Sequence, residues 1–271
     1  MAKPLKNFMG RALPDRYTCN ARLYPSLLVI APVVVAIVAI AKLEFSWLHT
    51  LWIGLGAVGG LYWLSQLARD PGKVLESGLW QMWGGMPSVA ILRHCDLRID
   101  AITKARYQAR LVELVPNTTA PTPESETQDP KSADMCYAAW STYLRNGTRD
   151  QKRFHLVFDE LVSYGYRRNL LGLRPYGLVS NILACLVCAG FISSALSQSH
   201  DVAAALWLAL FADILLLFFW AFRVSPPWVR LTADNYAARL VEAADDLYVG
   251  HPKAAAKAPA KARKTRTAGS T

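Results

Sequence analysis

The chain has 271 residues, 53% of them hydrophobic and 18% charged, with a formal net charge of +10. Its apolar residues fall into four blocks, two near each end, with polar sequence between them. That distribution argues against one or two soluble domains, which the length alone would allow. The five cysteines predict no disulfide framework, because three lie in segments assigned to the reducing cytoplasm and the others lie inside an apolar run.

The four apolar blocks predict four transmembrane helices. A hydrocarbon core of roughly 30 Å needs about 20 mainly apolar residues in a helix, and a helix satisfies its own backbone polar groups. The predicted spans are Tyr24–Ala41, Trp47–Ala68, Gly177–Ser197 and Val202–Phe222. The first is interpreted as a retained anchor, because this apolar run lacks a convincing small-x-small cleavage site and a second apolar run follows at once. Pro32 is expected to kink it.

The second span carries a Gly-x-x-x-Gly motif formed by Gly56 and Gly60. This spacing allows two helices to approach closely. It favours packing within the first pair of spans, and an oligomer contact is the alternative.

The stretch Leu75–Met86 follows the second span and carries Trp80 and Trp83. Two placements are open for it. Its tryptophans could lie among the lipid headgroups, as in an interfacial amphipathic helix. The stretch could equally pack on neighbouring helices.

Two capped helices are expected in the polar middle of the chain. Asp100 is expected to cap a helix that ends near Val115. A proline-rich polar loop over Pro116–Pro130 follows. Asp129 then caps a helix that begins with proline at its first position and ends near Arg145.

A third helix is expected over Arg149–Leu173, with Thr148 as its cap, because apolar residues recur there at helical spacing. It runs almost into the third span, and Gly165 and Pro175 mark expected bends. The segment Tyr164–Pro175 places arginines among aromatic and apolar residues beside the membrane.

The basic residues of this region have two interpretations. The favoured one is electrostatic anchoring to anionic lipid, worth about 1 kcal/mol per cation near the surface. The alternative is a phosphate-binding arginine cluster. The candidates are Arg145, Arg149, Arg153, Arg167, Arg168 and Arg174, with Lys152 beside them.

Asp213 lies midway along the fourth span and is the acidic candidate inside the membrane. A carboxylate at that depth is costly unless it is paired, hydrated or protonated. Asn181 or Ser180 on the third span, or Asp213 of another subunit, could pair with it. The alternative is a purely structural hydrogen bond from a protonated acid. No second acid or lysine lies within the spans, and the one histidine, His49, lies at the edge of the second span, which argues against a proton relay or secondary transporter.

The C-terminal part of the chain is predicted to leave the membrane through a proline turn over Val224–Trp228. Thr232 is expected to cap a last amphipathic helix that reaches Val249. The basic, alanine-rich tail beyond it is expected to be disordered.

Positive charge orients the chain. Fifteen Lys and Arg residues lie in the middle segment, five precede the first span and six lie in the tail, whereas the short connections between paired spans carry almost none. The positive-inside rule therefore places both termini and the middle in the cytoplasm. The expected fold is all-α, with two transmembrane hairpins flanking a cytoplasmic helical region. Its segments are a basic N-terminus at 1–23, a hairpin at 24–68, the helical region at 69–176, a hairpin at 177–222, an amphipathic helix at 223–250 and a tail at 251–271.

Known catalytic motifs are missing from the sequence. It has no phosphate-cradling glycine loop, no His-Glu-x-x-His and no Gly-x-Ser-x-Gly. His94-Cys95-Asp96 is the one cluster with ligand-like residues, and it is interpreted as a loop or helix start rather than a metal site. The chain is therefore expected to be non-enzymatic, with no metal and no cofactor.

Two runs in the middle of the chain, LRHCDLRIDAITKARYQARL and the stretch from PTPESETQDP to NLLGLRPYG, resemble a set of uncharacterised bacterial membrane proteins with four transmembrane helices. The resemblance extends from about Pro87 to the last amphipathic helix, where VRLTADNYAARLVEA also fits. The overall plan is also similar to the four-helix membrane effectors of antiphage signalling systems, as a likeness of architecture alone.

These observations favour a non-enzymatic effector that forms homo-oligomers through its spans and disrupts the membrane or forms a pore. Its cytoplasmic helices would respond to a nucleotide signal or a protein partner, and nucleic acid is not an expected partner. The alternatives are a membrane scaffold that anchors a partner complex, and a small channel or transporter.

Overall fold

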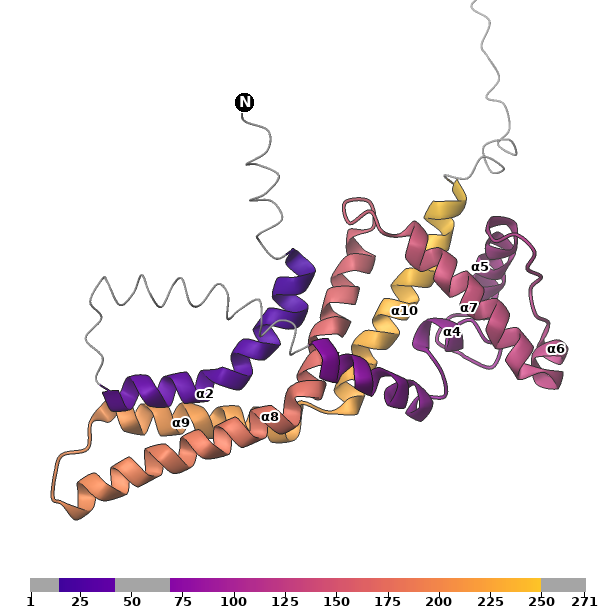
Figure 1. Cartoon of the computed structure of the whole chain (residues 1–271). Coiled ribbons are helices and arrows are strands. Elements are labelled where there is room, and N and C mark those ends of the chain that lie inside the picture. Colours follow the sequence, from indigo (N-terminus) through magenta and orange to yellow (C-terminus); the bar gives the residue numbers. More distant parts are fainter. Residues whose placement is uncertain (1–14, 42–68, 250–271) are drawn as a thin grey trace, which may run out of the picture. The chain divides into compact units, whose positions relative to one another are not determined.

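The computed structural model describes residues 15–41 and 69–249 (Figure 1). Across these two ranges all regular structure is helical and no strand is present, so the predicted all-α class is confirmed. The predicted second span, with Gly56 and Gly60, lies outside the described residues, as do most of the N-terminal stretch and the basic tail.

The chain divides into two compact units. The membrane unit comprises Met1–Pro87 and His155–Ala237. The polar unit comprises Ser88–Phe154 and Ala238–Thr271. Each unit has its own core and is described by itself below.

Three helices of the membrane unit are long and apolar enough to cross a bilayer: Thr18–Ile40, His155–Ser197 and Ala204–Arg223. They correspond to three of the four predicted spans, which supports a membrane protein with at least this much of the expected plan.

Two of these three helices combine α-helix with a short π-helical stretch. The first consists of the π-helix η1 (Thr18–Leu23) followed by α2 (Tyr24–Ala41), which has Pro32 in its interior. The last consists of α9 (Ala204–Phe218) followed by the π-helix η2 (Phe219–Arg223).

The remaining span is part of α8 (His155–Ser197), a helix of 43 residues. At 1.5 Å per residue it is about 65 Å long, roughly twice the thickness of a hydrocarbon core. Only its C-terminal half, from near Gly177, is mainly apolar and free of charged residues. The expected separate helix and third span are therefore one element, which continues through Gly165 and Pro175 and changes direction along its length (Figure 1).

The expected start of this helix at Arg149 was wrong. Thr148 is the C-cap of the preceding helix, and its hydroxyl donates to the carbonyl of Leu144 at 2.8 Å. Asp150 then accepts the backbone N–H of Lys152 at 3.0 Å. An aspartate that bonds the backbone two residues ahead forms a turn, so the helix begins only at His155.

Small residues allow the three apolar helices to pack side by side in the membrane unit (Figure 1). α2 contributes Ala36 and Ala39, α8 contributes Ala184 and Cys188, and α9 contributes Ala209 to one buried cluster. Small side chains at such contacts permit close backbone approach.

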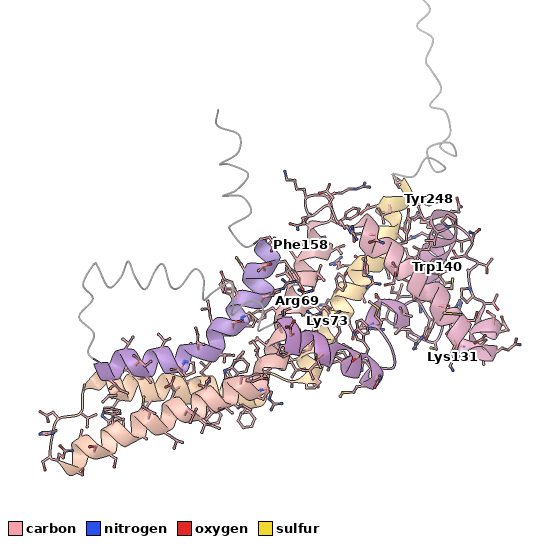
Figure 2. The ribbon with its side chains drawn as sticks, in the orientation of Figure 1. Arg69, Lys73, Lys131, Trp140, Phe158 and Tyr248 are labelled. Atoms are coloured by element: carbon pink, nitrogen blue, oxygen red, sulfur yellow. The ribbon has the colours of Figure 1, made fainter. Side chains whose placement is uncertain are left out.

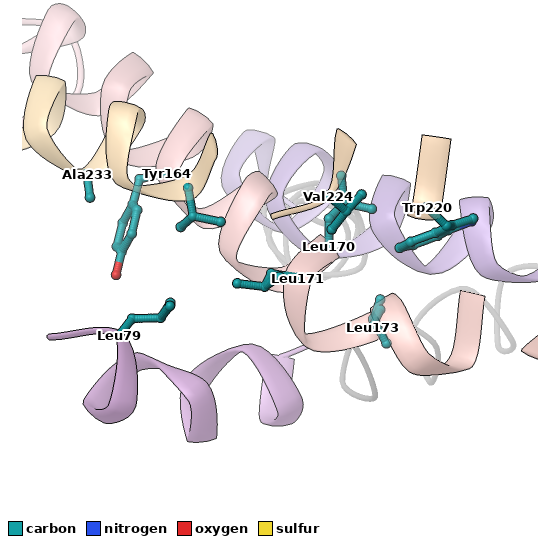
Figure 3. Close-up of a cluster of buried hydrophobic side chains, with 9 residues drawn as sticks. Leu79, Tyr164, Leu170, Leu171, Leu173, Trp220, Val224 and Ala233 are labelled. Carbon is teal, nitrogen blue, oxygen red and sulfur yellow. The ribbon is translucent and has the colours of Figure 1, made fainter. Parts of the chain in front are cut away.

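A second cluster with larger side chains joins the N-terminal half of α8 to the residues around η2 (Figure 3). It includes Tyr164, Leu170 and the fully buried Trp220. Leu79, from the helical residues 69–82, belongs to the same cluster. Of the two placements open for Leu75–Met86, packing on neighbouring helices is therefore the one supported.

Gly172 makes the contact between α8 and the helical residues 69–82 possible. A Cβ added at this position would clash with the backbone of Pro71 and Gly72. Any larger residue would have to push the two helices apart.

The polar unit contains α4 (Pro87–Ala90), α5 (Ala101–Leu114), α6 (Pro123–Gln128) and α7 (Pro130–Gly147), with the end of α10 (Pro226–Val249). Both predicted caps are confirmed. Asp100 accepts the N–H of Thr103 at 2.8 Å, and Asp129 accepts the N–H of Ser132 at 3.1 Å.

The polar unit also departs from expectation at one point. The loop expected over Pro116–Pro130 contains α6, which begins with a capping box between Thr122 and Ser125. Ser and Thr at these two positions satisfy each other's free backbone N–H groups. Proline directly after the cap suits a first helical turn.

α10 begins earlier than expected, so the turn predicted over Val224–Trp228 is confined to Val224 and Ser225. The helix starts at Pro226 rather than at Thr232. Proline fits the first turn of a helix because its missing N–H would have no partner there. Thr232 lies inside the helix, and its hydroxyl donates to the carbonyl of Val229 at 3.0 Å.

Candidate functional site

Asp213 of α9 is buried in the membrane unit with only 1% of its surface exposed. Its Oδ2 accepts no hydrogen bond from the residues that the structure describes. The carboxyl group lies within electrostatic reach of the Cys185 and Cys188 thiols on α8. Among the residues that the structure describes, a carboxylate in this position has no charged or hydrogen-bonding partner that would offset its burial.

The structure does not pair Asp213 with either partner expected on the third span. Asn181 is fully buried, but its Nδ2 donates to the carbonyl of Gly177 at 2.9 Å. Ser180 donates to the carbonyl of Val29 on α2 at 2.6 Å. The Oδ1 of Asn181 is itself without a donor in the described part of the chain. Asp213 and Asn181 on the described apolar helices therefore each have an oxygen that no described residue satisfies.

A fully paired network lies in the same unit, on the N-terminal half of α8. Arg168 and Glu76 form a buried ion pair at 2.8 Å. The Tyr164 hydroxyl donates to the same carboxylate at 3.0 Å, and Lys73 bonds its other oxygen. Burial alone would raise the pKa of Glu76, but the bond from Lys73 and the charge of Arg168 outweigh it and hold that pKa below its ordinary value.

Side chains of α8 also bond the two π-helical stretches. Asn169 Nδ2 donates to the carbonyl of Ala21 in η1 at 2.6 Å. Arg174 donates to the carbonyls of Trp220 and Ala221 in η2, at 3.1 and 2.8 Å. π-helical turns break the regular backbone pattern of a helix and are frequent at functional sites. α8 thus bonds both neighbouring spans at these irregular points.

Arg167 occupies a different position, against the indole of Trp228. Its guanidinium lies 4.7 Å from the ring centroid, and Nη1 donates to the Trp228 carbonyl at 3.0 Å. Arg223, the last residue of η2, lies 4.7 Å from the same centroid. Two cations therefore share one aromatic ring.

The other three basic candidates lie in the polar unit and make local contacts. Arg145 bonds Thr142 at 3.0 Å. Arg149 bonds Asn146 at 2.7 Å, and Arg153 bonds the Asp246 carbonyl at 2.9 Å. The six arginines thus belong to two units, and the joint phosphate-binding cluster remains a prediction.

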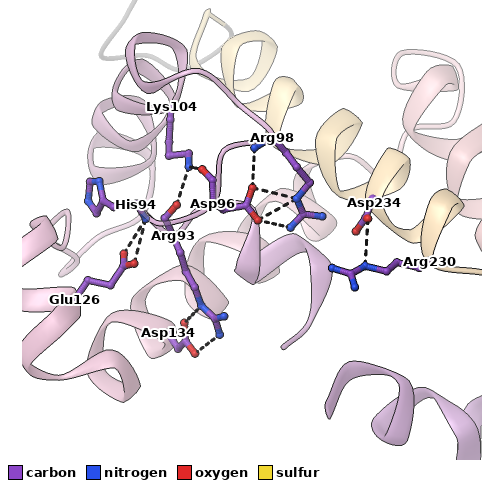
Figure 4. Close-up of polar contacts among 9 residues, drawn as sticks. All are labelled: Arg93, His94, Asp96, Arg98, Lys104, Glu126, Asp134, Arg230 and Asp234. Atoms are coloured by element: carbon purple, nitrogen blue, oxygen red, sulfur yellow. Dashed lines mark hydrogen bonds and ion pairs between the residues drawn. The ribbon is translucent and has the colours of Figure 1, made fainter. Parts of the chain in front are cut away.

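Within the polar unit, charged side chains join separate segments (Figure 4). Arg93 binds Asp134 through two hydrogen bonds, at 2.8 and 2.7 Å. Glu126 accepts the backbone N–H of His94 and the Tyr137 hydroxyl, the latter at 2.7 Å. The expected ligand-like cluster at His94 is therefore part of a structural network, since the imidazole Nε2 also bonds the Pro121 carbonyl at 2.8 Å.

Two further buried polar groups complete this network. Lys104 donates to the carbonyls of Arg93 and Asp96, and burial holds the pKa of its ammonium group below the ordinary value. The indole of Trp140 (Figure 2), which is fully buried, donates to the hydroxyl of Thr118 at 2.9 Å.

Several residues of these networks were missed by sequence reasoning. Glu76 and Asn169 had no role assigned, because nothing in the local sequence marks them as buried. The Glu76–Arg168 pair joins positions 92 residues apart. A pairing at that separation leaves no periodic or motif-like signal in a single sequence.

Comparison with known proteins found no match to a family model, to a curated protein or to a solved structure.

Proposed function

We propose that the chain is a non-enzymatic membrane effector of the bacterial inner membrane, which assembles through its spans and makes the membrane permeable. The observation that carries the proposal is Asp213, a buried acid among apolar helices with an oxygen that no described residue bonds. Intramembrane ionisable residues are rare and are associated with function because their burial is costly.

The cost of burying Asp213 favours a second arrangement of the spans. Leaving a buried polar group unpaired costs about 1–3 kcal/mol. A rearrangement that exposes Asp213 to water, or pairs it with its counterpart in another copy, would recover that free energy. The packed helices then represent a closed state, and permeabilisation requires the acid to leave its buried position.

The outer surface of the same helices supports assembly within a bilayer. Leu186 of α8 is 64% exposed, and Leu208 and Phe211 of α9 are 68% and 61% exposed. Apolar side chains project along all three helices (Figure 2). Such surfaces require cover by lipid or by other copies of the chain.

Control by the polar unit follows from the continuity of the chain. The polar unit reaches Phe154, and α8 begins at the next residue and continues into its apolar half without a break. A nucleotide signal or protein that binds the polar unit would therefore act on a helix that carries the change into the membrane. Both termini and the polar unit would lie in the cytoplasm, as the distribution of basic residues favours.

A scaffold function is the second candidate, and exposed apolar residues in the polar unit favour it. Leu97 is 90% exposed and Ile102 is 85% exposed. Large apolar side chains held in water are common at protein–protein contacts. In this case the membrane helices would serve only as an anchor.

The test is membrane depolarisation in a bacterium that expresses the full chain, followed with a potential-sensitive dye. The parent chain is expected to depolarise the cells, and Asp213→Asn to lose most of that effect. Asp201→Asn, which changes an exposed acid in the connection between α8 and α9, is the matched control and should behave as the parent does.

A chain that causes no depolarisation, even under phage challenge in its native gene context, would overturn the effector proposal. The scaffold would then be the better account. It predicts a co-purifying protein that is lost in the Leu97→Ser/Ile102→Ser variant and retained in Asp213→Asn.

A further inference from the structure

Arg167 and Arg223 come together from different elements at the end of the last apolar helix. Arg167 projects from α8, Arg223 ends η2, and Trp228 lies in the first turn of α10. Both guanidinium groups lie 4.7 Å from the centroid of the Trp228 ring. The indole holds the two cations near one another, where their charges repel.

No carboxylate in the described ranges lies within ion-pair distance of either arginine. Arg167 feels the charge of Glu160 only through longer-range attraction. Arg223 is exposed, and its guanidinium makes no hydrogen bond to a described residue. Arg167 donates from Nη1 to the Trp228 carbonyl at 3.0 Å, whereas Arg168 pairs with the Glu76 carboxylate and Arg174 donates to two carbonyls. Positive charge therefore accumulates at this point without a counter-charge from the described residues.

An apolar surface lies directly beside this positive charge. Phe218 and Phe222 stack at a centroid distance of 5.7 Å, and they are 55% and 75% exposed. Phe222 immediately precedes Arg223 in the chain. The combination of exposed aromatic rings, an indole and cations is typical of the membrane–water interface.

We propose that Arg167, Arg223 and Trp228 form a binding site for the phosphate group of an anionic phospholipid. Guanidinium groups bind phosphate oxygens through paired, charge-assisted hydrogen bonds. The negative charge would relieve the repulsion between the two arginines, and the acyl chains would cover Phe218 and Phe222. A free phosphate would satisfy the cations but leave the aromatic surface uncovered, so the lipid is the ligand favoured. The site is independent of the effector function.

Lipid binding to the full chain in detergent, measured by native mass spectrometry, tests the site. The probes are phosphatidylglycerol, phosphatidylcholine and soluble glycerol 3-phosphate. The parent is expected to bind phosphatidylglycerol about tenfold more tightly than phosphatidylcholine. The Arg167→Gln/Arg223→Gln variant should lose that preference.

The matched control is Arg16→Gln/Arg230→Gln, which removes the same charge from the same unit. Arg16 pairs with Asp159 at 2.9 Å, and Arg230 lies 3.6 Å from Asp234. This variant should keep the parent's preference. If the first variant does not fold, Arg223→Gln alone replaces it, because that side chain is exposed and makes no hydrogen bond in the described structure.

An unchanged lipid preference in the folded Arg223→Gln or Arg167→Gln/Arg223→Gln variant would overturn the proposal. So would glycerol 3-phosphate binding as tightly as phosphatidylglycerol, because the aromatic surface would then contribute nothing and the site would serve a soluble phosphate.

Discussion

The two units treat buried polar groups differently. In the polar unit, Lys104 bonds two carbonyls and Gln108 donates to the carbonyl of Leu92 at 2.9 Å. Ser88 and Ser141, also buried, bond one another at 2.8 Å. In the membrane unit, Asp213 and Asn181 are as deeply buried, yet each has an oxygen with no donor among the described residues.

This difference distinguishes buried polar groups that stabilise the fold from a buried polar group that is a candidate for function. A buried polar group that is fully bonded contributes to a specific fold, whereas an unsatisfied one costs free energy in that fold. The membrane unit can pair its buried groups, as Arg168 and Glu76 show outside the apolar half of α8. Asp213 therefore differs from the buried charges of Arg168 and Glu76 in the same unit, which bond one another.

The largest expected effect comes from breaking the paired network of the membrane unit. Arg168→Ala leaves the Glu76 charge buried without its main partner, which typically costs about 3–5 kcal/mol. A value near the lower end is expected, because Lys73 and Tyr164 still bond Glu76. The free energy of unfolding is measured by sodium dodecyl sulfate titration of the chain in mixed micelles.

Two further variants serve as controls for this experiment. Arg16→Ala breaks an exposed ion pair with Asp159, whose side chains are 61% and 45% exposed, and should cost no more than about 1 kcal/mol. Glu76→Leu/Arg168→Met removes both charges and should recover most of the loss. If the double variant were as unstable as Arg168→Ala, an unpaired charge would not be the cause.

A smaller effect is expected where α8 approaches the helical residues 69–82. Gly172→Ala places a methyl group against the backbone of Gly72, and such overpacking costs about 1–3 kcal/mol. Gly190→Ala is the matched control on the same helix, because a Cβ there meets nothing within 4 Å. It should be neutral or stabilising, since alanine favours a helix over glycine. Equal stabilities of the two variants in the same titration would contradict this account of the contact.

Local signals in the sequence predicted much of the helical structure. α2 has the predicted bounds Tyr24–Ala41, and Asp100 and Asp129 cap the helices assigned to them. These features depend on composition and on neighbours three or four residues away. The continuous α8 was missed because Pro175 and the charged residues before it look like a boundary, although the helix continues through them.

The candidate site was only partly predictable, for a related reason. Asp213 could be identified because an acid stands out in an apolar run. Its surroundings could not be identified, because hydropathy does not show in which direction a side chain points. Asn181, an expected partner of Asp213, bonds the Gly177 carbonyl of its own helix. The site formed by Arg167, Arg223 and Trp228 joins three elements, and only Arg167 had been singled out.

The smallest expected effect is a pH dependence in the polar unit, and it tests whether that unit's bonded groups contribute stability. Burial alone would raise the pKa of Glu126, but hydrogen bonds from the His94 N–H and the Tyr137 hydroxyl lower it below its ordinary value. A carboxyl group whose folded pKa is depressed contributes stability above its unfolded pKa, near 4.3, and loses it as pH falls through the folded value.

The thermal midpoint of the parent should therefore fall between about pH 5 and pH 3. Glu126→Gln keeps an acceptor for both donors but cannot titrate, so its midpoint should fall less over the same range. If the thermal midpoints of the two proteins fell equally between pH 5 and pH 3, the hydrogen bonds to Glu126 would position the chain without stabilising it.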